Sequence, residues 1–136
     1  MTLAMSGPLQ EAIYALLSDD AALADVVGSA IYDAVPHGTL PPIYVLLGVE
    51  DVRDASDGTG AGALHQLTIS VVTTVAGFAG AKLAAAAISD VLDGARPVLP
   101  RGRVIFIRFD RARARRVEGA STRQLDMRFL ARVEDD

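Results

Sequence analysis

The first thirty residues place apolar side chains at the three- and four-residue spacing of amphipathic helices. The helix expected to begin at residues 6–8 repeats Leu9, Ile13, Leu16 and Leu17. Asp19 or Asp20 can cap a second helix, and Gly28 can end it. Residues 31–42 contain three prolines and a glycine, so we predict an extended linker there.

An alternation in which most odd positions are apolar follows in residues 43–52 and 65–75, as expected for strands with one buried face. The apolar sets are Ile43, Val45, Leu47 and Val49, and then Leu67, Ile69, Val71 and Val75. Residues 54–62 between them have no apolar anchor, so the pattern predicts a long hairpin with a flexible loop.

Helical spacing returns after Gly77 and ends at Gly94. The expected buried stripe is Ala84, Ala87, Ile88 and Val91, with Leu83 and Leu92 beside it. We expect residues 103–117 to form a long strand whose first half is mostly apolar and packs in the core. In its second half Arg111, Arg113 and Arg115 alternate with alanines, so the strand should carry a row of guanidinium groups past the core.

A turn at residues 118–121 should return the chain as a last strand. Its expected apolar face is Leu125, Met127, Phe129, Ala131 and Val133. The order α-α-β-β-α-β-β predicts an α+β fold: an antiparallel four-stranded sheet with helices packed on one face. The length of 136 residues indicates a single domain, residues 1–136.

Charge is divided unevenly along the chain. Residues 1–95 hold two basic and eleven acidic side chains, whereas residues 96–136 hold eleven arginines and six acidic side chains. Two oppositely charged surfaces suit a subunit that docks head to tail with its copies, or one that lies between two different partners. An ordinary solvated pair of arginine-rich strands would give the same pattern.

Sites for enzymatic chemistry, cofactors and metals are not evident. The chain has no cysteine, which excludes disulfides, thiolate catalysis and Cys-ligated zinc. The glycines of residues 58–62 resemble a dinucleotide-binding motif, but that motif must be followed by a helix and these glycines are followed by a strand. A calcium-binding loop that started at Asp54 would have His65 at the position where Glu is required. We expect His37 and His65 to be exposed and inert, and the protein not to be an enzyme.

No run of apolar residues reaches the eighteen needed to span a membrane, and residues 1–6 lack the features of a signal peptide. A membrane partner is therefore not expected.

Several turns and strand starts resemble one known family. They are residues 16–20 (LLSDD), 31–36 (IYDAVP) and 42–48 (PIYVLLG), followed by the helix at residues 77–92 and the arginine-rich strand pair. Together they resemble the tail-completion proteins of long-tailed phages, and more closely the tail terminator of alphaproteobacterial gene transfer agents. The resemblance covers residues 9–134, and its motifs are structural rather than catalytic.

The resemblance implies a structural virion protein at the neck of the tail, assembled in the bacterial cytoplasm. Such a protein forms a ring, six-fold in the family, that caps the finished tail tube. It stops further polymerisation of tube protein and offers a surface to the head connector. The implied partners are copies of itself, the tube protein, and the head-tail connector or stopper, with DNA passing through the lumen.

Two groups of residues gain candidate roles from this resemblance. Those for a subunit interface or the lumen are Arg108, Arg111, Arg113, Arg115 and Arg116. Those for a loop that docks on the tube are Asp54, Asp57, Gly58, Gly60 and Gly62. We favour a neighbouring subunit for the arginines, because a strongly attractive lumen would slow the exit of DNA.

Two other functions stay open at this point. One is a different neck component, such as a head-tail stopper or connector. The other is a small α+β regulatory module that binds a metabolite at its sheet edge, although the few aromatic residues disfavour such a pocket.

Overall fold

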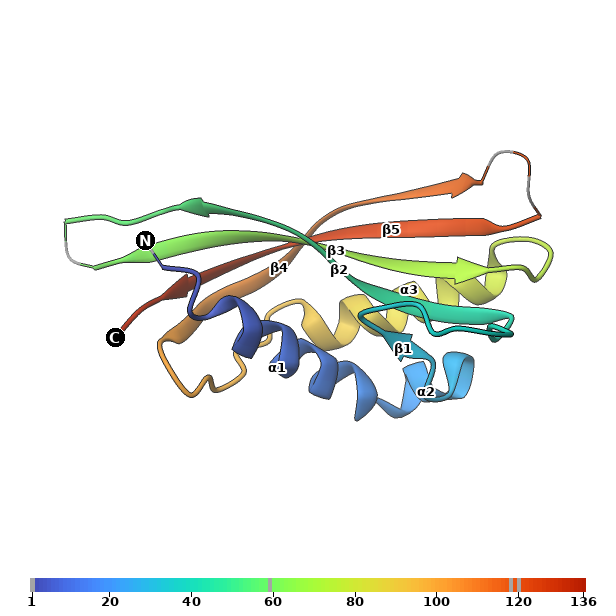
Figure 1. Ribbon diagram of the computed structural model, residues 1–136, viewed down its shortest axis with the longest axis horizontal. Coiled ribbons are helices and arrows are strands. Elements are labelled where there is room, and N and C mark those ends of the chain that lie inside the picture. The colour runs from blue at the N-terminus through green and yellow to red at the C-terminus, as the bar shows by residue number, and fades with distance from the viewer. Residues whose placement is uncertain (1, 59, 118, 120) are drawn as a thin grey trace.

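Three helices lie together on one side of a twisted sheet in the computed structural model, which describes residues 2–58, 60–117, 119 and 121–136 (Figure 1). The helices are α1 (Ser6–Ser18), α2 (Ala21–Val27) and α3 (Ala79–Leu92). The strands are β1 (Ile31–Tyr32), β2 (Ile43–Asp54), β3 (Gly62–Thr73), β4 (Arg103–Arg116) and β5 (Arg123–Glu134). The loop expected at residues 54–62 and the turn expected at 118–121 fall partly outside the described residues.

The sheet corrects one part of the predicted fold. It has five strands in the order β1-β2-β3-β5-β4, and β1 runs parallel to β2 while the other pairs are antiparallel. The extra strand lies at the start of the segment expected to be a linker, where buried Ile31 pairs with Val45. Two apolar residues before the prolines were enough to extend the sheet, although they are too few to show an alternation.

The core lies between the sheet and the helices. The predicted apolar face of β5 is confirmed, since all five of its residues are buried. In α3 the small side chains of Ala84 and Ala87 are buried with Ile88 and Leu92, which lets the helix approach the sheet closely. Leu83 is 64% exposed and faces away from the core.

A bulge in β2 overturns part of the predicted alternation. Its pairing with β3 shifts between Leu46 and Val49, around Gly48 with φ of 132°. After the shift Val49 is 67% exposed, whereas Val52 packs against the core. Val75, also expected on the buried face, lies beyond the end of β3 and is 53% exposed.

The two hairpins turn at opposite ends of the molecule, and the β2–β3 hairpin extends well past the helices (Figure 1). The β4–β5 hairpin lies at the other end, where it rises away from the loop that joins β3 to α3. The arginine-rich half of β4 therefore lies at the end opposite to the acidic loop around Asp57.

Candidate interaction surface

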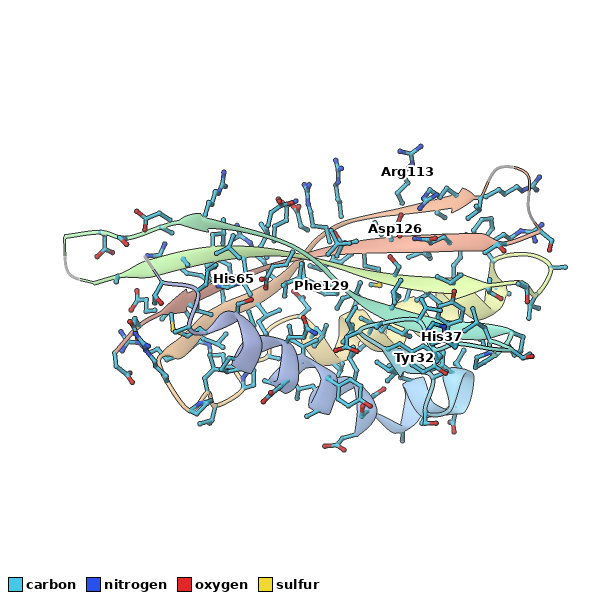
Figure 2. All side chains as sticks on the ribbon, in the orientation of Figure 1. Tyr32, His37, His65, Arg113, Asp126 and Phe129 are labelled. Atoms are coloured by element: carbon cyan, nitrogen blue, oxygen red, sulfur yellow. The ribbon has the colours of Figure 1, made fainter. Side chains whose placement is uncertain are left out.

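The second half of β4, residues 111–116, forms an arm that we call the arginine arm. Arg111, Arg113 and Arg115 pair across the ladder with residues on the face of β5 that the helices do not cover. The alternating Ala112 and Ala114 pair with the buried Met127 and Leu125. The expected row is confirmed, and Figure 2 shows Arg113 pointing away from the body of the protein.

Arg115 is held by an acidic residue of its own sheet. Its Nε lies 3.1 Å from Oδ2 of Asp126, whose other oxygen accepts hydrogen bonds from Ser70 Oγ (2.6 Å) and Gln124 Nε2 (2.8 Å). Burial alone would raise the pKa of Asp126, but these three hydrogen bonds outweigh it and lower the pKa. Arg115 therefore has a structural role besides any contact with a partner.

The other arginines of the candidate set have no carboxylate partner among the described residues. Arg111 and Arg113 are exposed, and the guanidinium of Arg108 stacks on Phe106 at 4.8 Å from the ring centroid. Arg116 follows Arg115 and so projects to the opposite face of the strand. This end of the sheet thus presents uncompensated positive charge.

The backbone of the arginine arm is also open to a partner. β4 is an edge strand, and near the end of α3 its edge is covered by bonds from Gly94 N to Ile107 O (2.8 Å) and from Phe109 N to Asp93 Oδ1 (2.9 Å). Within the described residues no hydrogen bond covers the outer edge of residues 111–116. Exposed edges of this kind pair readily with another chain unless charge prevents it.

The tip of the β2–β3 hairpin carries the second candidate group. Asp54 accepts hydrogen bonds from the Ser56 hydroxyl (2.6 Å) and backbone (3.0 Å), which lower the pKa of its carboxyl. Asp57 accepts one from Gly60 N (3.0 Å) and lies 3.8 Å from Arg132 Nη2.

The glycines of this tip differ in exposure. Gly58 and Gly60 are exposed, but Gly62 is buried at the start of β3, where a Cβ would lie 2.9 Å from Ala55 O. The flexibility of the loop and its contact with a tube stay predictions.

One buried polar contact was missed from the sequence. His65 is fully buried, not exposed, and its Nδ1 lies 3.1 Å from Glu50 Oε2, while Ser6 Oγ donates to Glu50 Oε1 at 2.6 Å. Because a carboxylate only accepts, Nδ1 carries the proton. The signal was available, since His65 continues the buried series Leu67 and Ile69 at period two. His37 is exposed, as expected.

The described residues hold no group of three His, Cys, Asp or Glu side chains that could bind a metal ion. None of their helices combines the length and the apolar character required to cross a membrane.

Comparisons with known proteins identify the family of this chain. The sequence model of the tail completion protein gp17 family matches residues 11–134. One similar solved structure is a chain of the virion of a native gene transfer agent particle, with 59% identity and a TM-score of 0.93. The match covers 98% of this chain and 99% of that one, whereas a search of curated proteins found no match. The chain belongs to the tail completion protein gp17 family.

Proposed function

We propose that this protein is a tail terminator, a structural protein of a phage-like particle. It forms a ring on the end of the finished tail tube, stops further addition of tube protein, and provides the surface to which the head connector joins. The observation that carries the proposal is the match to a virion chain along nearly the whole length of both proteins, at 59% identity.

The charge distribution supports assembly into a ring. The arginine arm lies at one edge of the sheet, and the acidic first two-thirds of the chain supplies the other edge and the helices. Opposite charges on opposite edges favour head-to-tail contact, which closes into a ring when each step adds a fixed rotation. We therefore assign Arg111 and Arg113 to the contact with a neighbouring copy, and the tip around Asp54 and Asp57 to contact with the tube.

Polymerisation of purified tube protein tests this function. Adding the purified chain should stop elongation and leave it bound at one end of each tube. Arg113→Glu should lose this effect, whereas Arg96→Glu, an exposed charge reversal outside the arm, should keep it. Unchanged growth with the wild-type chain would contradict the proposal.

A further inference from the structure

A groove at the β1 edge of the sheet has the chemistry of a binding site for arginine side chains. It has a volume of about 600 Å³ and lies between α1 and the β1–β2 pair. Glu11 and Tyr14 of α1 line it together with Tyr32 and Asp33, and no lysine or arginine lines it. We call it the tyrosine groove.

The groove gathers tyrosines that are rare in this chain. The protein has three tyrosines and no tryptophan, and Tyr44 packs beside Tyr32 with ring centroids 5.9 Å apart. Tyr14 is 45% exposed even though it is large and aromatic. Exposed tyrosines beside carboxylates can hold a guanidinium through both its π face and its charge, and tyrosine and arginine are enriched in binding hot spots.

The exposed surface continues past the groove. A second depression of about 330 Å³ shares Asp33 and Leu47 with it and reaches the exposed Val35 and Val49. The bulge in β2 is what turns Val49 outward at this place. The combined surface therefore offers aromatic and apolar contact area together with the acidic side chains of Glu11 and Asp33.

We propose that the tyrosine groove receives the arginine arm of a second copy of this chain. The arm supplies the matching chemistry, because Arg111 and Arg113 have no acidic partner within the described residues of their own copy. β1 and β4 form opposite edges of the sheet with three strands between them, so the arm cannot reach its own groove (Figure 2). This inference rests on the proposed ring and identifies the contact that builds it.

Cross-linking in assembled particles tests the contact directly. The natural chain has no cysteine, so a chain carrying Tyr14→Cys and Ala112→Cys has one thiol in the groove and one on the arm. A bifunctional maleimide should join neighbouring copies into a ladder of multimers. The matched control carries Ala22→Cys, exposed on α2, with the same Ala112→Cys and should give no ladder. The inference is overturned if only the control pair gives a ladder. It is also overturned if neither pair gives a ladder in particles that contain the protein.

A charge swap supplies a second measurement that does not depend on new thiols. Asp33→Arg should lower the yield of complete particles about tenfold, because like charges then meet in the groove. Adding Arg113→Asp should restore it, and Asp25→Arg on α2 should leave the yield unchanged. Full yield with Asp33→Arg, or no restoration by Arg113→Asp, overturns the inference. The terminator role would still stand in that case, since it is judged by tube length.

Discussion

The Nδ1 atom of His65 lies 3.1 Å from Oε2 of Glu50 beneath the first turn of α1. The contact joins β3 to β2, and the hydroxyl of Ser6 extends it to the helix. It exists because the bulge between Leu46 and Val49 turns Glu50 toward the helical layer.

This contact predicts a specific dependence of stability on pH. The hydrogen bond from His65, with that from Ser6, lowers the pKa of Glu50 below 4.5 despite its partial burial. When the pKa of a carboxyl is lower in the folded protein than in the unfolded protein, its ionised form stabilises the fold. This stabilisation is fully present at pH values above the unfolded-state pKa, and it is lost as the pH falls through the folded-state pKa. Glu50→Gln should therefore lower the free energy of unfolding by about 1–2 kcal/mol at pH 7, and by progressively less below pH 4.5.

Urea unfolding of both proteins at several pH values measures that difference. Glu11→Gln, at an exposed position of α1, is the control and should change little. A cost of Glu50→Gln that stays constant from pH 7 to pH 3 would contradict the assignment.

Phe129 is expected to be a major determinant of stability. It is fully buried and contacts Phe109 edge to face, with ring centroids 5.8 Å apart. Phe129→Ala should lower the free energy of unfolding by about 3–5 kcal/mol, because it leaves a cavity in the core. Phe109→Ala should lower the free energy of unfolding clearly less, because Phe109 is 41% exposed on an edge strand. Equal costs in urea unfolding would count against the described core.

Gly102 should tolerate no side chain. Its φ is 70°, and a Cβ would lie 2.4 Å from the backbone oxygen of Glu134. Gly28 has a similar φ of 61° but nothing within 4 Å of the added atom. Gly28→Ala should therefore lower the free energy of unfolding by about 1–3 kcal/mol for the backbone conformation alone, and Gly102→Ala should lower it distinctly more. Thermal unfolding of the two variants should rank them in that order, and the reverse order would be inconsistent with the turn before β4.

Substitutions at Arg113 and Arg115 should differ in their effect on stability although both impair assembly. Arg115→Ala removes the ion pair with Asp126 and should cost up to about 1 kcal/mol, because the pair is partly exposed. Arg113→Ala should leave the free energy of unfolding unchanged. Both should reduce incorporation into particles, as quantified by protein content per particle.

Charge reversal at Arg113 also distinguishes a neighbour from the lumen. If the arm contacts a copy, Arg113→Glu reduces the number of complete particles while each complete particle delivers its DNA normally. Normal assembly with altered DNA delivery would place the arm in the lumen instead.

Much of this fold could be predicted from periodicity. The stripe of α3 and the alternation of β5 are long and regular, so periodicity correctly predicts that Ile88 and Phe129 lie in the core. Two features could not be predicted in this way. The strand β1 has only two residues, which are too few to show a period. The bulge at Gly48 reverses the alternation midway through β2. It turns Val49 outward and gives His65 a carboxylate partner.

The candidate interaction surface was predictable in part for a similar reason. The arginine row follows from strict alternation within one strand, and the structure placed it as expected. The tyrosine groove combines residues from α1 and β1 that are far apart in sequence, and only the packing of the helix on the sheet brings Tyr14 close to Tyr32.

Electron microscopy of particles from cells that lack this gene tests the central claim most directly. We predict headless tubes of variable and excessive length, because nothing then stops the addition of tube protein. Tails of normal length that are not attached to heads would contradict termination and assign the protein to head-tail joining. Unchanged particles would contradict both roles.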